Sequence, residues 1–238
     1  MINICGISDL HGHIEFDVEK CDVLCIAGDI LPLSAQSHFH KSEQWLINEF
    51  KPWCEKQKAN EICLIGGNHD FFLHNFPEKV KGIFKDSKVH YLFDEKFTYS
   101  NEIGEEYVFY GSPWCHIFGR WAFMGYTDEK LKDIFLKMPD NVDVLITHDA
   151  PYGTSDICMQ DLPYISKKHI GNKALKEAIE QKKPKINLHG HLHSTNHDKE
   201  MLDDTAVYNV SVLDETYKLT YYPLYLELEK TNGEETNK

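Results

Sequence analysis

The 238-residue sequence lacks several features that define common classes of protein. No apolar run approaches the roughly 20 residues of a membrane-spanning helix. The first residues, MINICGISDLHGH, contain neither a basic region nor a small-residue cleavage site, so we expect no membrane segment, no signal peptide and a cytoplasmic location. The seven cysteines include no C-x-x-C pair, which favours buried reduced thiols over disulfides or a zinc cluster.

Basic residues are also scarce, with 25 Lys and Arg against 38 Asp and Glu and a formal net charge of −13. Proteins that bind bare duplexes usually carry a basic face, so we expect no nonspecific duplex DNA binding. A small anionic substrate is compatible with this charge, because exposed charges are screened over about 8 Å at physiological salt. The sequence indicates no oligomeric state.

Continuous apolar segments predict short strands that are covered on both faces, with helical patterns between them. The expected strands are Ile2–Ile7, Val23–Ala27, Ile62–Ile65, Val142–Thr147 and Ile186–Leu188. The expected helices are Ser42–Lys58, which Pro52 should kink or restart, Thr127–Met138, with Thr127 as N-cap, and Asn172–Gln181.

Antiparallel segments are predicted as well. Alternating residues from Phe97 to Gly111 flank a turn at Gly104 and indicate a hairpin. The segments Ala206–Val212 and Thr220–Leu228 are predicted to form another strand pair. Together the patterns favour an α/β fold with two sheets packed face to face and helices outside. We expect one domain over residues 1–229 and a polar tail at 230–238.

Polar residues follow five of the expected strands, usually beside glycine. Functional groups gather at the carboxyl ends of strands in α/β sheets, and glycine there lets the backbone turn tightly. The set comprises Asp9, His11, Asp29, Asn68, His148, His191 and His193. These oxygen and nitrogen donors exceed the need of one ion and fit two divalent transition-metal ions, Mn, Fe, Co, Ni or Zn. The alternative, unrelated turns and capped histidines, explains five ordered motifs poorly.

The ordered motifs resemble the calcineurin-like metallophosphoesterase superfamily. The matching segments are Asp9-Leu10-His11, Gly28-Asp29, Gly67-Asn68-His69-Asp70, Thr147-His148 and Gly190-His191-Leu192-His193. The resemblance implies a four-layer α/β/β/α sandwich of two mixed β-sheets flanked by helices. It assigns Asp9, His11 and His193 to one metal. It assigns Asn68, His148 and His191 to the other, and it makes Asp29 the bridge between the two ions.

The resemblance also implies a reaction, the hydrolysis of a small phosphate ester by a hydroxide that bridges the metals. His69 would act on the substrate as the general acid, and Asp70 would orient His69 and favour its imidazolium form. Two further residues, His13 and Arg120, are candidate substrate contacts. The alternative interpretations are an ordinary loop histidine for His13 and a surface salt bridge for Arg120.

An aromatic segment runs from Gly111 to Phe123. Its parts Gly111-Ser112-Pro113-Trp114 and Trp121-Ala122-Phe123 are similar to metallophosphoesterase-domain proteins with cyclic-nucleotide phosphodiesterase-like activity. Core packing beneath the hairpin explains these aromatic residues equally well. Our leading hypothesis is a dinuclear metal-dependent phosphodiesterase. The alternatives are a phosphomonoesterase and a non-catalytic interaction scaffold of the same fold.

Overall fold

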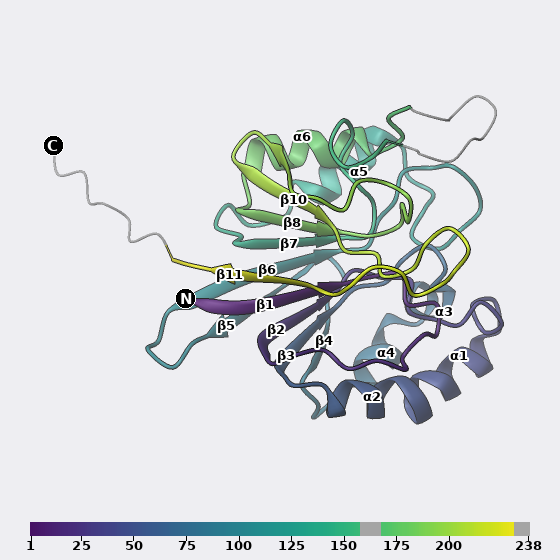
Figure 1. The fold of residues 1–238 in the computed structure, drawn as a ribbon. Helices are drawn as coiled ribbons and strands as arrows, with labels where there is room; N and C mark the ends of the chain where they lie inside the picture. Colours follow the sequence, from purple (N-terminus) through teal and green to yellow (C-terminus); the bar gives the residue numbers. More distant parts are fainter. Residues whose placement is uncertain (158–167, 231–238) are drawn as a thin grey trace, which may run out of the picture.

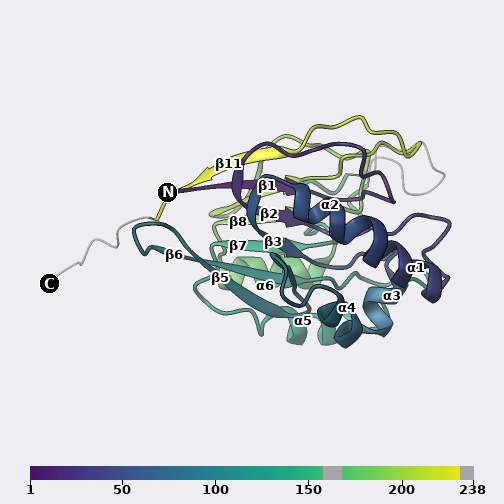
Figure 2. The same cartoon turned by 90° about the horizontal axis from the view of Figure 1, so that it is seen from below.

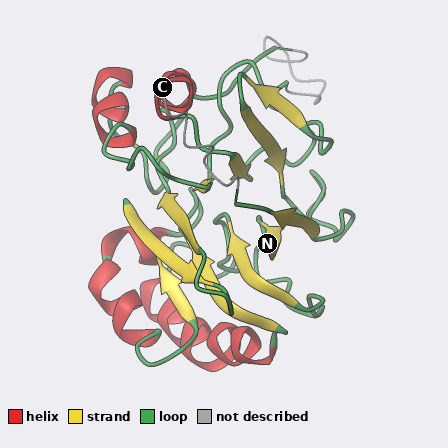
Figure 3. Cartoon of the chain, turned by 90° about the vertical axis from the view of Figure 1, so that its left-hand side faces the viewer, coloured by secondary structure: helices red, strands yellow, loops and turns green. Residues whose placement is uncertain are grey.

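The computed structural model describes residues 1–157 and 168–230, and in it two β-sheets lie between two sets of helices (Figure 1). The strand orders are β11-β1-β2-β3-β4 in the first sheet and β5-β6-β7-β8-β10-β9 in the second. Figure 3 shows the helices in two separate groups. The predicted architecture of two mixed sheets flanked by helices is confirmed. The predicted tail at 230–238 lies outside the described residues, apart from Lys230, and so does Cys158.

The first sheet combines the first four strands of the chain with the last one. Its strands are β1 (Ile2–Ile7), β2 (Cys21–Ile26), β3 (Ala59–Leu64), β4 (Val89–Tyr91) and β11 (Leu224–Leu228). Strands β1 to β4 are parallel, so their carboxyl ends meet at one edge. The covering helices are α1 (Phe39–Trp45), the π-helical turn η1 (Leu46–Phe50), α2 (Lys51–Lys56), α3 (Phe71–Asn75) and α4 (Pro77–Ile83) (Figure 2).

The second sheet has four parallel strands with one antiparallel strand at each edge. Its strands are β5 (Glu95–Ser100), β6 (Glu106–Ser112), β7 (Val144–Thr147), β8 (Ile186–His189), β9 (Glu200–Leu202) and β10 (Thr205–Asn209). The helices α5 (Asp128–Phe135) and α6 (Lys173–Lys182) cover its outer face (Figure 1). Thr127 caps α5 as predicted, since its side chain accepts a hydrogen bond from the Lys130 backbone.

Alternate residues of the inner strands enter two different cores. In β2, Val23 and Cys25 belong to the cluster between the sheets, whereas Leu24 and Ile26 belong to the cluster that includes helix residues. Burial on both faces explains the continuous apolar runs of the sequence. The six cysteines within the described residues are buried and free of disulfides. Over the same residues, no helix has the length and apolar character needed to cross a membrane.

One expectation about the elements is wrong, and a second is right about the effect of Pro52 but not about the helix bounds. The late strand pair is wrong, because β10 pairs with β8 and β9 in the second sheet, while β11 pairs with β1 in the first. The chain instead crosses between the sheets after β10. The helix predicted over Ser42–Lys58 spans Phe39–Trp45, η1 and α2, and Pro52 lies near the start of α2 after the π-helical turn. Proline lacks a backbone N–H, and the looser turn before it accommodates that loss.

Candidate metal centre

The structure brings the seven predicted metal ligands together, because β1, β2, β3, β7 and β8 all end at the same side of the two sheets. Asp29 lies at the middle of the group. Its Oδ2 atom is 3.7 Å from His11 Nε2 and 3.3 Å from His148 Nε2. A carboxylate between two imidazoles has the position of a bridging ligand.

The remaining ligands lie on the two sides of Asp29. On one side, His193 Nε2 is 3.3 Å from an Asp9 carboxylate oxygen, and Asp9, His11 and His193 offer ligand atoms within 4.8 Å of one another. On the other side, Asn68 Oδ1 is 2.9 Å from His148 Nε2. The ring of His191 lies 5.2 Å from the ring of His148. The side chains that the motifs assign to each metal thus lie near one another, and the assignment itself stays a prediction.

The chemistry of His11 fits a bound cation. Both ring nitrogens are buried, and among the described residues neither has a hydrogen-bond partner. Buried polar atoms normally have partners, so the ring nitrogen that carries the lone pair fits a cation as its partner. Burial lowers the pKa of His11 to about 4, although Asp29 and Asp9 act in the opposite direction. A neutral imidazole is the form that binds a metal.

The histidines of the cluster differ in the direction in which their pKa is shifted. Burial also lowers the pKa of His191 to about 4, so one of its ring nitrogens has a free lone pair. Burial acts to lower the pKa of His148 as well, but Asp29 outweighs it and raises the value to about 10. In the same way, Asp9 outweighs burial at His193 and raises its pKa to about 9. Metal binding at these two histidines therefore displaces protons.

Four of the seven predicted ligands have a left-handed backbone conformation, which residues other than glycine rarely adopt. The φ angles are 56° at Asp9, 44° at His11, 52° at Asp29 and 70° at His191. Glycine completes the turn at position 28, where φ is 95° and a Cβ atom would lie 2.7 Å from His148 Nδ1. Such strain is held by surrounding structure and clusters at functional sites.

Asp70 does not orient the His69 ring as predicted. Its carboxylate accepts hydrogen bonds from the backbone N–H groups of Ile30 at 3.2 Å, Leu31 at 3.0 Å and Gly67 at 2.9 Å. Burial, with a further contribution from Asp29, raises its pKa to about 7. Asp70 thus joins the loop after β2 to the loop that carries His69, and it positions His69 through the backbone.

His69 lies at the edge of the cluster. Its Nε2 atom is 4.0 Å from Asp29 Oδ2, and its backbone N–H donates to Asp29 Oδ1 at 2.7 Å. The other ring nitrogen, Nδ1, contacts the side-chain oxygen of Gln36. Sequence patterns gave no signal for Gln36, because it lies in a turn between β2 and α1 and precedes His69 by 33 residues.

Removal of the Gln36 side chain is expected to slow turnover. We predict that Gln36→Ala lowers kcat by about 10-fold to 10²-fold with little change in KM, because a misplaced catalytic group loses rate rather than binding. Gln36→Glu keeps an acceptor oxygen at the same place and should retain more of the rate. Steady-state kinetics of both variants measure the change in kcat. An equal kcat in Gln36→Ala and the parent protein would show that Gln36 does not position His69.

The two candidate substrate contacts do not gather at the site. His13 is partly exposed and pairs with Glu15 at 2.9 Å, which agrees with an ordinary loop histidine. Arg120 is exposed. Neither His13 nor Arg120 is among the described residues that border the cavity at the metal centre.

The aromatic segment from Gly111 to Phe123 divides between core and site. Trp114 and Phe123 are buried in the core, as packing predicts. Trp121 and Phe118 are instead exposed and border the cavity at the metal centre. The Trp121 ring lies 4.7 Å from the ring of His69, and Phe118 stacks on His191 at 4.9 Å. Tyr217, which the motifs did not indicate, lies 5.0 Å from the His11 ring.

The fold and the polar cluster define a phosphoesterase of the calcineurin-like type. Residues 2–195 match the calcineurin-like phosphoesterase family, and the chain belongs to it. The chain is similar to metallophosphoesterase domain-containing protein 1 of Homo sapiens, with 26% identity over 246 residues that cover 93% of this chain and 69% of that protein. UPF0046 protein T07D4.2 of Caenorhabditis elegans is 27% identical, over 77% of this chain and 49% of its own length. Family membership supports hydrolysis of phosphoesters with divalent metal ions.

Solved structures share the fold at low identity. The phosphopantetheinyl hydrolase of Mycobacterium tuberculosis has a TM-score of 0.58 and 12% identity, over 90% of both chains. GAP50, described as the anchor in the inner membrane complex of Plasmodium, has a TM-score of 0.50 and 10% identity, over 89% of this chain and 71% of its own. One is a hydrolase and the other an anchor, so the fold alone does not choose between catalyst and scaffold.

Proposed function

We propose that the protein hydrolyses a phosphodiester with two divalent transition-metal ions, manganese among the candidates, held at the strand ends. The observation that carries this proposal is the buried cluster around Asp29, in which neither ring nitrogen of His11 has a hydrogen-bond partner among the described residues. The cluster borders a cavity of about 160 Å³. When bound, the ions would neutralise phosphoryl oxygens and lower the pKa of the attacking water.

The donor set favours an anionic substrate. Two divalent ions bring four positive charges, while Asp9 and Asp29 are the carboxylates in the proposed set and Asn68 is neutral. The formal charge therefore stays positive. At about 4 Å and an effective dielectric of about 20, one pair of unit charges contributes about 4 kcal/mol. This local attraction outweighs the screened negative charge of the protein surface.

His69 is the proposed general acid. Its Nε2 atom lies toward the cluster, Gln36 contacts Nδ1, and Trp121 lies against the ring. This arrangement supports a role for the imidazole beside the oxygen of a leaving group. A proton from Nε2 to that oxygen avoids the formation of a free alkoxide.

The two alternatives differ in what they leave unexplained. A non-catalytic scaffold gives no reason why buried His11 has no hydrogen bond to any described residue at its ring nitrogens, or why four polar residues have left-handed backbone. A phosphomonoesterase uses the same metal cluster, so the distinction depends on how many organic groups the site can hold.

Paired chromogenic substrates test the proposal. We expect protein loaded with Mn²⁺ to hydrolyse bis-p-nitrophenyl phosphate with a kcat/KM at least about tenfold above that for p-nitrophenyl phosphate, a difference of about 1.4 kcal/mol in activation free energy. Protein stripped by a chelator is the control and should turn over neither ester. A higher kcat/KM on the monoester would indicate a phosphomonoesterase, and no turnover of either ester would indicate a scaffold.

A further inference from the structure

The chain between β10 and β11 forms a short hairpin beside the candidate metal centre. Leu213 and Leu219 pair as an antiparallel bridge, and Asp214 builds the turn between them. The Asp214 carboxylate accepts hydrogen bonds from the backbone N–H groups of Thr216 at 2.8 Å and Lys218 at 3.1 Å. An aspartate that accepts from the backbone two residues further on fixes the course of a turn. The hairpin therefore has a defined shape.

The hairpin also orients one of the predicted metal ligands. His193 Nδ1 lies 3.0 Å from the backbone carbonyl oxygen of Asp214. A carbonyl oxygen only accepts hydrogen bonds, so Nδ1 carries a hydrogen and Nε2 is the nitrogen that faces the cluster. Nε2 lies 3.3 Å from an Asp9 carboxylate oxygen. The position of the hairpin is therefore tied to the geometry of the candidate metal centre.

Tyr217 lies in this hairpin with a strained backbone. Its φ angle is 59°, in the left-handed region that a bulky residue rarely adopts. Its backbone N–H donates to the Asp214 carbonyl oxygen at 2.8 Å, which helps to hold this conformation. The Tyr217 ring makes T-shaped contacts with the rings of His11 and His193, at centroid distances of 5.0 Å and 5.6 Å. Such strain clusters at functional sites, so we expect the Tyr217 side chain to have a role in the site.

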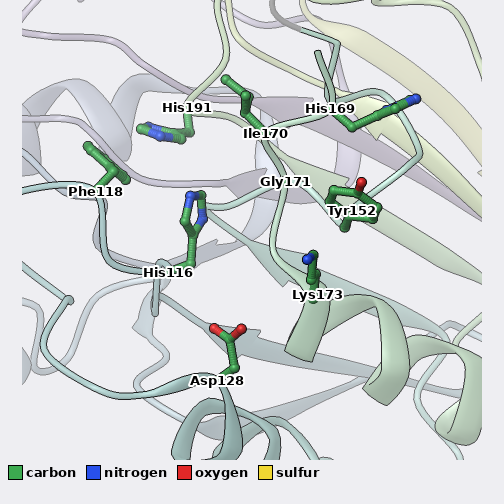
Figure 4. Close-up of a pocket in the computed structure, with 9 residues that line it drawn as sticks. All are labelled: His116, Phe118, Asp128, Tyr152, His169, Ile170, Gly171, Lys173 and His191. Carbon is green, nitrogen blue, oxygen red and sulfur yellow. The ribbon is translucent and has the colours of Figure 1, made fainter. Parts of the chain in front are cut away.

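Tyr217 borders the cavity at the metal centre, which has a volume of about 160 Å³. A water molecule takes about 30 Å³ in the liquid, so this cavity has room for a phosphoryl group and few other atoms. A larger cavity of about 600 Å³ adjoins it, with Phe118 and His191 in its wall (Figure 4). Among the described residues, Tyr217 lines the small cavity and not the large one. Its side chain is therefore placed to meet the phosphoryl group and not the organic part of an ester.

We infer, on the basis of the proposed function, that Tyr217 is a catalytic residue whose hydroxyl donates a hydrogen bond to a phosphoryl oxygen of the bound ester. The phenol O–H is a donor, and no hydrogen bond to another described residue occupies it. Negative charge spreads over the phosphoryl oxygens in the transition state of phosphoryl transfer. A donor that the hairpin already holds in place stabilises this charge without reorganisation.

Tyr217 and His69 act on different oxygens in this account. The His69 ring also contacts His11, at a centroid distance of 4.9 Å, but its proposed proton goes to the leaving oxygen. Tyr217 would donate to oxygens that stay on phosphorus. These oxygens are the same in every ester, so the contribution of Tyr217 should not depend on the leaving group. This difference separates the two roles in kinetic measurements.

Tyr217→Phe tests this inference, because it keeps the ring and its packing and removes the hydroxyl. We expect kcat/KM of the metal-loaded protein to fall by about 10-fold to 10²-fold, by the same factor on p-nitrophenyl and alkyl diesters, with unchanged metal content. Tyr222→Phe, at a tyrosine that is 93% exposed, is the matched control and should keep the parent rates. Equal kcat/KM in Tyr217→Phe and the parent protein would overturn the inference. A loss that grows with the pKa of the leaving group would also overturn it, since Tyr217 would then be a proton donor.

A calorimetric titration of the metal-loaded protein with inorganic phosphate gives a second measure that needs no turnover. We expect phosphate to bind about tenfold more weakly to Tyr217→Phe than to the parent protein, and equally to Tyr222→Phe. This result would support the inference even if the parent protein hydrolyses no ester, in which case the proposed function alone fails. Equal phosphate affinity in Tyr217→Phe and the parent protein would overturn the inference while hydrolysis stands. A parent protein that neither binds phosphate nor hydrolyses esters would overturn both.

Discussion

Replacement of Asp29 by alanine is expected to remove metal from both positions and to lower turnover by more than about 10³-fold, beyond the usual effect of losing one electrostatic group. The reason is the place of its carboxylate. One oxygen lies between His11 Nε2 and His148 Nε2, and the other accepts the backbone N–H of His69. A single substitution would therefore remove the proposed bridging ligand and a support of the proposed acid.

Asp29→Asn is the matched variant, because it keeps the size of the side chain and one acceptor oxygen but loses the charge. We expect Asp29→Asn to retain more metal than Asp29→Ala. Its metal content and turnover should both stay well below those of the parent protein. Elemental analysis per chain and turnover of bis-p-nitrophenyl phosphate provide the two readouts. Two metal ions per chain in Asp29→Ala would show that Asp29 does not bridge them.

His69→Ala is expected to cost about 10²–10⁴ in rate on esters with poor leaving groups, while the metal content stays at the parent level. Alkoxides need a proton as they leave, whereas p-nitrophenolate leaves without one. The loss should therefore be much smaller on p-nitrophenyl esters. Rates on a series of leaving groups of rising pKa measure this difference directly.

A matched control for His69 is His40→Ala, at an exposed histidine of α1. It should leave the dependence on the leaving group unchanged. An equal loss of rate on p-nitrophenyl and alkyl esters in His69→Ala would count against proton donation. Loss of metal in His69→Ala would instead indicate that His69 is a metal ligand, since it offers a ring nitrogen within 4.8 Å of ligand atoms of His11 and Asp29.

The predicted ligands could be found in the sequence because parallel strands end at a common edge. Asp9, Asn68 and His148 lie far apart in the chain, yet each follows an apolar run and so reaches the same place. Continuous apolar runs predicted the strands themselves, since neighbouring residues such as Val23 and Leu24 are buried on opposite faces. These features depend on local pattern and on the geometry of parallel sheets.

Contacts between loops could not be predicted in the same way. Gln36 meets His69, and the Asp70 carboxylate meets the backbone of Ile30, through turns whose course no periodicity describes. The partner of β11 was missed for a related reason. Its alternating pattern indicates a strand with one covered face, but the choice of β1 over β10 is set by long-range packing.

The structure places the aromatic residues between Gly111 and Phe123 in two different environments. Sequence alone left core packing and substrate contact equally open, and the structure confirms core packing for part of the segment. Trp114 is buried, whereas Trp121 and Phe118 border the metal centre beside His69 and His191. Alternation between buried and exposed aromatic residues in a loop follows from its path over the surface, which has no fixed period.

The most direct test of the account is the location of metal in crystals of the protein grown with Mn²⁺, by anomalous scattering. We predict two peaks about 3.5–4 Å apart, with Asp29 between them. One peak should lie beside Asp9, His11 and His193, and the other beside Asn68, His148 and His191. A single peak, or peaks away from Asp29, would contradict the dinuclear centre on which the proposed hydrolysis depends.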